Sequence, residues 1–362
     1  MMDKVFFYLY PDIDRPVYEH CSLSLAEGLI SHGFTVKGNR EYWWDHAKSN
    51  FTIPYGDYDE DSDYTFVSAN YLIAKGDLPY IHTNTISVLI DDVDGRFTFS
   101  HTNICTKFNI VLKCHYLQRD KVNFAKNVYP WSFGLTERII RSISFKESKA
   151  LKNEVGVSYR VGYNFRSIFV NTMLRYKNPA VSFFTSLNCQ AGDKKSYWYQ
   201  TFFRHDEDYF RFHNEYKYGL AVGGDAIVNF LPFAHGNRAI DKLSRFVSRR
   251  VAFFFMKLDF FRRFVFVYQF DSWRFWELMV SRSLPISACC DDWGFIYPVM
   301  PLSNEHYIGI KRNEIKTFPK KINTLTDHQL KKISQTGHQF ALDHYSPRAV
   351  AARFLSIAKN NQ

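Results

Sequence analysis

The segment from Tyr268 to Ile286 constrains the fold and the function of this chain more than any other stretch. It contains a polar loop that ends in Ser272, then a helical pattern with Arg274 and Glu277, and then the apolar run 284–287. This order predicts a loop, a helix and a short buried strand. A helix N-terminus attracts anions through its free N–H groups and its dipole, so a diphosphate fits there, with Glu277 accepting hydrogen bonds from ribose hydroxyls. The segment therefore predicts a nucleotide-sugar site.

The sequence D-S-W-R-F-W-E, followed six residues later by L-P-I, resembles the nucleotide-binding signature of GT-B glycosyltransferases of the exostosin-like and group 1-like branches. Residues 209–225 are similar to the strand and loop that precede this signature in the family. Ser283 stands where the family usually has a glycine. The resemblance covers residues 150–360 and implies an α/β chain with two Rossmann-like doubly wound domains facing a cleft.

The rest of the chain fits two such domains. Its 362 residues, 46% of them apolar, are enough for two cores. Short apolar runs that end at polar loops predict parallel strands in both halves. We expect an N-terminal acceptor-binding domain over 1–149 and a C-terminal nucleotide-sugar-binding domain over 150–337, with an amphipathic insertion at 226–266. The helical pattern over 338–362, broken at Ser346-Pro347, is expected to return to the first domain.

The expected donor site lies in the second domain. The Arg274 guanidinium would donate two parallel hydrogen bonds to phosphate oxygens, and Glu277 would bind the ribose. In doubly wound domains, pyrophosphate docks at the junction of the first strand and the helix that follows it, which places residues 159–166 near the donor. The predicted donor-binding residues are Arg160, Arg166, Lys217, Gly224, Ser272, Arg274 and Glu277. The same residues also have an explanation without a ligand. Arg274 and Glu277, three residues apart on a helix, would form an exposed ion pair, and residues 159–166 would form an ordinary turn with solvated arginines.

Activation of an acceptor hydroxyl requires a base, which we expect from the first domain. The sequence does not separate the candidates for this base, which are Asp12, Asp14, Asp91, Asp92, Asp94, His82 and His101. The residues that we name as catalytic are Asp14, Asp92 and Asp94. Retaining GT-B enzymes of the commonest kind carry a second Glu eight positions before the one on this helix. Because Gln269 occupies that position here, we expect inversion of the anomeric centre.

We expect that the protein needs no cofactor beyond its nucleotide-sugar substrate and that it binds no divalent metal. The alternative is a GT-A-like enzyme that binds a metal through Asp92 and Asp94, since this D-x-D pattern follows an apolar run. The six cysteines show no zinc-type spacing with histidine.

Positive charge is concentrated in the second half of the chain. Residues 1–148 hold 15 Lys and Arg against 19 Asp and Glu, whereas residues 149–362 hold 31 against 17. Apolar and basic positions alternate at helical spacing over 238–263, which predicts one continuous amphipathic helix. Such a helix suits an anionic membrane surface, and the residues expected to meet it are Arg245, Arg249, Arg250 and Phe254. An ordinary helix packed on the domain explains the pattern equally well.

The partners expected from these features are a nucleotide sugar and a glycan or lipid-linked glycan acceptor, without nucleic acid. No signal peptide and no long apolar segment is evident, so we expect a cytoplasmic protein that can reach the cytoplasmic face of the membrane through the basic helix. The competing function class is a non-catalytic protein that binds membranes or polyanions.

Overall fold

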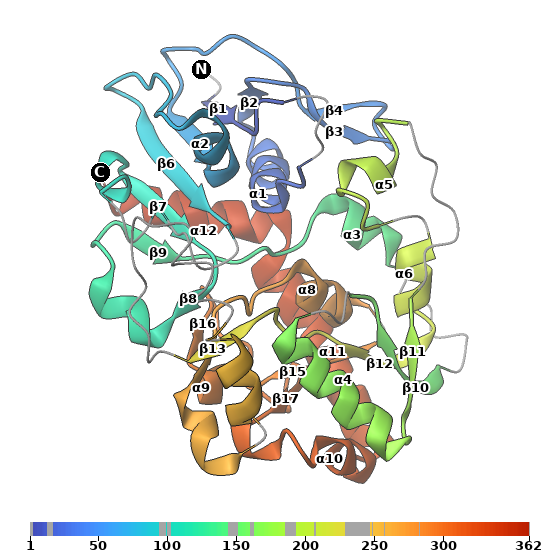
Figure 1. Ribbon diagram of the computed structural model, residues 1–362. Helices are drawn as coiled ribbons and strands as arrows, with labels where there is room; N and C mark the ends of the chain where they lie inside the picture. The colour runs from blue at the N-terminus through green and yellow to red at the C-terminus, as the bar shows by residue number, and fades with distance from the viewer. Residues whose placement is uncertain are drawn as a thin grey trace.

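The computed structural model describes residues 3–12, 17–93, 99, 103–143, 151–159, 163–184, 193–205, 208–228, 247, 249–256, 258–281 and 283–361. These residues form two α/β lobes, each built on a parallel sheet (Figure 1). The expected α/β class is therefore confirmed. The predicted domain boundary near residue 150 adjoins residues 144–150, which lie outside the described ranges.

The first lobe contains a sheet with the strand order β2-β1-β5-β6-β7-β9, in which all neighbours are parallel. Its strands are β1 (Lys4–Tyr8), β2 (Thr35–Gly38), β5 (Tyr64–Ser68), β6 (Ile86–Asp91), β7 (Ile110–Lys113) and β9 (Val128–Pro130). Both faces of this sheet are buried: Phe66 and Val88 belong to the main core, whereas Val67 and Leu89 pack in a separate cluster on the other face. Burial on both faces explains why the inner strands β6 and β7 read as nearly continuous apolar runs, whereas β2 at the edge alternates between buried and exposed residues.

Helices and short strands complete the first lobe. They are α1 (His20–Ser31), α2 (Ala69–Lys75), α3 (Glu137–Ser142), the 3-10 turns η2 (Cys105–Lys107) and η3 (Gln118–Asn123), the β3 (Tyr42–Asp45) and β4 (Asn50–Ile53) hairpin, and β8 (Tyr116–Leu117). Strand β8 pairs with β16 (Phe295–Ile296) of the second lobe. The two lobes are therefore joined by a backbone ladder as well as by the chain itself.

The second lobe contains a parallel sheet with the order β11-β10-β12-β15-β17. The strands are β10 (Lys152–Val157), β11 (Ala180–Phe183), β12 (Tyr216–Leu220), β15 (Leu284–Ala288) and β17 (Ile308–Ile310). The accompanying helices are α4 (Asn164–Tyr176), α5 (Tyr197–Gln200), α6 (Asp208–His213), α8 (Trp273–Val280), α9 (Cys290–Trp293), η5 (Arg312–Glu314) and α10 (Phe318–Thr324). The predicted loop, helix and strand over 268–286 are thus confirmed.

The predicted continuous helix over 238–263 is wrong in its second part. Residues 249–256 are helical, but Asp259–Phe264 form the 3-10 helix η4. The chain then enters β14 (Val265–Val267), which pairs antiparallel with β13 (Ala226–Val228). Because β14 must return to β13, the chain has to leave the α-helix before it reaches residue 265.

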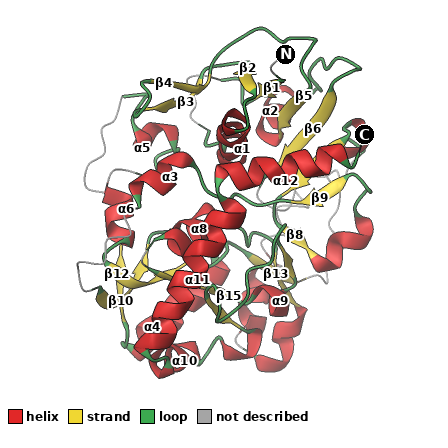
Figure 2. Cartoon of the chain, turned by 180° about the vertical axis from the view of Figure 1, so that it is seen from behind, coloured by secondary structure: helices red, strands yellow, loops and turns green. Residues whose placement is uncertain are grey.

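Two helices end the chain, α11 (Asp327–Tyr345) and α12 (Pro347–Lys359). They meet at Ser346, where the sequence predicts a break. Helix α12 packs along α1 in the first lobe (Figure 2), and the ring of Phe354 contacts that of Phe66 at 4.9 Å between centroids. No helix in the described part of the chain is long and apolar enough to cross a membrane.

Candidate active site between the two lobes

The entrance of α8 lies against the first lobe. Ser272 caps the helix, its Oγ accepting a hydrogen bond from the Arg274 backbone N–H at 3.3 Å. The preceding Asp271 is buried and accepts hydrogen bonds from the backbone N–H of Phe133 at 2.9 Å and from Trp276 Nε1 at 3.1 Å. Burial raises the pKa of Asp271 to about 6. The structure therefore gives Asp271 the role of anchoring the loop to the first lobe.

Two guanidinium groups meet on one aromatic ring beside this entrance. The Arg166 and Arg274 guanidinium carbons lie 4.8 and 5.4 Å from the centroid of the Tyr159 ring. Arg274 Nε donates to Ser158 Oγ at 3.0 Å, and Arg166 Nε donates to the Val222 carbonyl at 3.3 Å. The hydrogen bonds of Arg274 to described residues thus leave its two Nη groups for a ligand. This positive group lies where β10 ends and α4 begins, the junction at which the sequence places the pyrophosphate.

Glu277 lies on the inner side of α8 and has no exposed surface. Its Oε2 accepts a hydrogen bond from the Tyr209 hydroxyl at 2.9 Å, and its Oε1 lies 3.9 Å from His205 Nε2. Burial raises the pKa of Glu277 to about 7, against the opposing effect of the Arg274 and Arg138 charges and the Tyr209 hydrogen bond. Oε1 is buried and has no hydrogen-bond partner among the described residues.

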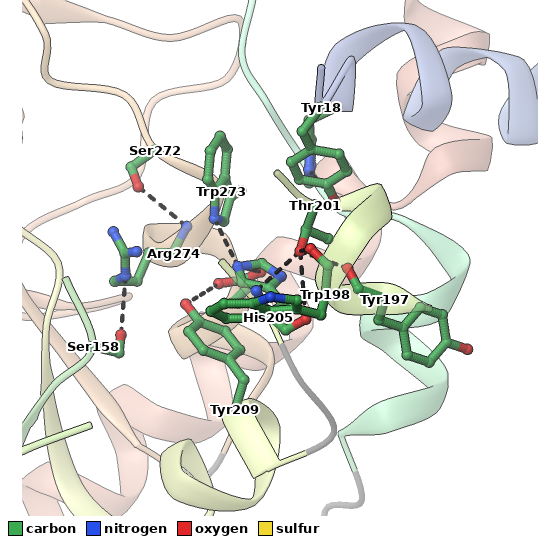
Figure 3. A network of polar contacts seen from close by, with 12 residues as sticks. Tyr18, Ser158, Tyr197, Trp198, Thr201, His205, Tyr209, Ser272, Trp273 and Arg274 are labelled. Atoms are coloured by element: carbon green, nitrogen blue, oxygen red, sulfur yellow. Dashed lines mark hydrogen bonds and ion pairs between the residues drawn. The ribbon is translucent and has the colours of Figure 1, made fainter. Parts of the chain in front are cut away.

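Aromatic side chains from both lobes gather around His205, which lies beside Glu277 (Figure 3). The His205 and Tyr209 rings stack with their centroids 4.0 Å apart, and Trp273 Nε1 donates to His205 Nε2 at 3.2 Å. From the first lobe, Tyr18 meets the Trp273 ring edge-on at 5.3 Å, and His20 stacks on it at 5.7 Å. These rings, together with the rest of the core, leave the Glu277 side chain with no exposed surface.

A buried cation from the first lobe completes this group. Arg138, on α3, is 3% exposed, and its guanidinium lies 3.8 Å from the Tyr197 ring centroid. Nε and Nη1 of Arg138 have no hydrogen-bond partner among the described residues. Burial lowers the pKa of Arg138, and Glu277 is among the groups that oppose this effect. A first-lobe cation therefore acts electrostatically on a second-lobe carboxyl group.

The sequence pattern did not identify several of these residues. Tyr18 and His20 lie more than 100 residues before Arg138 and His205 in the chain, and none of the four belongs to a recognisable motif. His20 carries no charge near neutral pH, because burial lowers its pKa to about 4. Tyr209 was within the segment that resembles the family, but nothing in its spacing marked it as the partner of Glu277.

Two predicted donor residues lie apart from this group or have another explanation. Lys217 lies in the amino-terminal half of β12, where its Nζ is 2.7 Å from Asp327 Oδ1. The backbone N–H of Gly224 donates to the Gln269 carbonyl at 2.6 Å, and a Cβ at Gly224 would lie 2.4 Å from Gln269 Oε1. Close packing of two backbone segments therefore accounts for this glycine. Arg160 lies outside the described residues.

Ser283 does not require the flexibility of the glycine that the family usually has there. It does not have a positive φ. Its hydroxyl donates to the His213 carbonyl at 2.8 Å and the Tyr216 carbonyl at 2.5 Å. The serine thereby ties the turn before β15 to the turn before β12.

The first-lobe carboxylates gather where its strands end. Asp91 Oδ2 lies 3.5 Å from Lys113 Nζ, and both side chains are buried. The neighbouring Asp92 is also buried, and its pKa is raised well above the ordinary value, first by burial and then by the charges of Glu19 and Asp91. Within the described ranges, no group of three or more His, Cys, Asp or Glu side chains could hold a metal ion. Asp14 and Asp94 lie outside those ranges.

Comparison with solved structures identifies the fold. The chain matches an α-glucosyltransferase in complex with UDP and DNA with a TM-score of 0.57 and 10% identity, covering 99% of this chain and 100% of that chain. It matches a sucrose-phosphate synthase from Thermosynechococcus elongatus with a TM-score of 0.52 and 9% identity, covering 99% and 98%. For Anabaena HepE in complex with UDP and glucose, the TM-score is 0.50 and the identity 11%, covering 99% and 100%.

The chain has the GT-B fold. The GT-A-like alternative, which uses Asp92 and Asp94 for a metal, therefore loses its structural basis. Another match, TarM, has a TM-score of 0.47, and the chain spans about half of its length, 55%. No known family matches the sequence, and no curated protein does. The exostosin-like branch stays a prediction.

Proposed function

We propose that the protein is a glycosyltransferase that moves a sugar from a nucleoside diphosphate sugar to a glycan or glycolipid acceptor. The observation that carries the proposal is the pair of guanidinium groups, Arg166 and Arg274, on the Tyr159 ring. Two neighbouring cations at the carboxyl end of a parallel strand match the charge of a diphosphate. The similar HepE structures contain UDP with glucose or UDP-glucose, which supports a donor of this class.

The chemistry of transfer follows from this placement. When the bond between the sugar and the diphosphate breaks, negative charge develops on the departing phosphate, and a preorganised cation lowers the barrier most at that moment. The arginines supply such charge from the chain itself, so we propose transfer without a metal. Glu277 is proposed to contact the ribose, which requires His205 and Tyr209 to move because the carboxyl group is buried.

We further propose that the transfer inverts the anomeric centre, with a first-lobe carboxylate as the base. Asp92 directly follows β6, at the end of the strand where the buried carboxyl groups of the first lobe gather. A carboxyl group accepts a proton only in its ionised form, and burial raises the pKa of Asp92. The buried Lys113 opposes this effect. Transfer through Asp92 is therefore expected to slow as the pH falls.

The test separates donor binding from turnover. UDP-glucose is titrated calorimetrically into the wild type, Arg274→Gln, and Arg175→Gln as a matched control, because Arg175 is an exposed residue at the far end of α4. Loss of a charge-assisted contact to phosphate should weaken binding in R274Q by roughly 10- to 100-fold and leave R175Q unchanged. Asp92→Asn should bind UDP-glucose normally but lose activity roughly 100-fold or more.

The acceptor is screened with oligosaccharides, lipid-linked sugars and duplex DNA, with product detected by mass spectrometry. Equal UDP-glucose affinity in the wild type and R274Q would contradict the donor site. Donor binding without hydrolysis or transfer to any acceptor would contradict catalysis and favour a non-catalytic protein. Efficient transfer to DNA alone would overturn the glycan assignment.

A further inference from the structure

We propose that the outer face of residues 247–264 is a docking surface for an anionic lipid bilayer. Within the described part of this segment, the side chains that form the surface are Val247, Arg250, Phe254, Leu258, Phe261 and Arg263. We refer to them as the basic aromatic surface. The segment that carries these side chains runs at an outer edge of the second lobe, in the gold and orange region of Figure 1.

The helical part of the segment presents opposite faces to the protein and to solvent. Ala252 is fully buried and Met256 is 1% exposed, so these residues, one helical turn apart, fix the inner face on the second lobe. Phe254 points the other way and is 59% exposed. Transfer of an exposed aromatic ring out of water is favourable, so an apolar partner would stabilise this arrangement.

The apolar character continues beyond the helix. Val247, Leu258 and Phe261 are 40%, 38% and 36% exposed. The centroid of the Phe255 ring lies 6.4 Å from that of Phe254 and 4.7 Å from that of Phe261. The rings therefore form a continuous strip across the end of the α-helix and the start of η4, and not isolated apolar residues, which are common on protein surfaces.

The charge around this strip selects the occupant. The exposed charged side chains described in this segment are all basic: Arg249, Arg250 and Arg263. Arg249 pairs with the buried Asp225, which holds the helix on the lobe, and the Arg263 guanidinium lies 4.8 Å from the Phe264 ring centroid. Cations interleaved with aromatic rings match the boundary between anionic headgroups and acyl chains.

The experiment measures binding of the full chain to sedimented vesicles. One vesicle preparation contains phosphatidylglycerol with phosphatidylcholine, and the other contains phosphatidylcholine alone. We expect binding to the anionic vesicles, weakened by added salt. Because each cation near the headgroups contributes about 1 kcal/mol, the double variant Arg250→Glu with Arg263→Glu should lower the partition coefficient by roughly 30-fold or more.

The aromatic contribution is tested with Phe254→Asp. Its matched control is Ile73→Asp on α2, since Ile73 is an apolar residue of similar exposure, 56%, in the other lobe. F254D should lose vesicle binding, whereas I73D should retain it. Both should unfold in urea with a single cooperative transition like that of the wild type, which shows that they are folded and keeps this result independent of the donor-site proposal.

Three outcomes would overturn the docking surface. Equal binding to both vesicle types would show that the arginines do not select anionic lipid. Equal loss in F254D and I73D would show that the contact is not located on residues 247–264. Concentration-dependent dimerisation of the wild type that F254D abolishes would assign the surface to a second copy of the chain instead.

Discussion

Replacing Glu277 with glutamine should change the stability of the protein in a way that depends on pH. The folded protein holds the Glu277 proton up to about pH 7, compared with an ordinary value of 4.5. Between these pH values the folded state binds a proton that the unfolded state has released. The free energy of unfolding therefore falls as the pH rises. At about 1.4 kcal/mol for each pH unit, the loss amounts to about 3 kcal/mol.

The glutamine variant lacks this loss because it does not ionise, while its amide oxygen can still accept the Tyr209 hydrogen bond. Relative to the wild type, E277Q should therefore gain about 3 kcal/mol in free energy of unfolding between pH 4.5 and pH 8. Urea denaturation without nucleotide measures the difference. Contributions from other titrating groups cancel in the comparison. Glu41→Gln serves as control, since Glu41 is exposed.

The expected shift has a clear refutation. If E277Q and the wild type keep a constant difference in unfolding free energy across this pH range, then Glu277 is ionised normally in the folded state. Its burial against Tyr209 and His205 would then be wrong, and an open carboxylate that receives ribose without rearrangement would replace it.

Two further predictions concern contacts between the lobes. Arg138→Met should raise the pH at which Glu277 titrates, because the Arg138 charge lowers the pKa of that carboxyl group; the same urea series in the R138M background measures it, and an unchanged midpoint would disprove the coupling. Gly28→Ala should destabilise the protein by about 2 kcal/mol, because a Cβ at Gly28 would lie 2.0 Å from the Pro347 carbonyl oxygen. Thermal unfolding measures the loss, with Gly33→Ala as the comparison. At Gly33 a Cβ meets nothing within 4 Å but φ is +92°, so the comparison separates a packing clash between helices from local backbone strain.

The regular parts of the fold could be predicted from the sequence because their signals are local. Strand β5 is one of the short runs that predict parallel strands, because a strand buried on both faces lacks a regular alternation of apolar and polar residues. The break at Ser346-Pro347 separates α11 from α12 because proline cannot continue the hydrogen bonding of the preceding helix. Both signals lie within a few residues of the feature they predict.

The site was harder to predict because its members meet only in three dimensions. Arg166 and Arg274 were identified from their positions at two helix starts, but their shared contact with Tyr159 depends on how β10 and α8 are placed. Arg138 and His205 carry no local signal. The predicted helix over 238–263 failed at its end because the pairing of β14 with β13, a non-local contact, overrode the helical periodicity.

The seating of α12 on the first lobe has a consequence for biosynthesis. Phe354 contacts the Tyr64 and Phe66 rings, and Gly28 of α1 lies directly against Pro347. A ribosome delivers the first lobe before it delivers these helical residues. The apolar face of the first lobe that α12 covers therefore stays exposed to water until α12 has been synthesised.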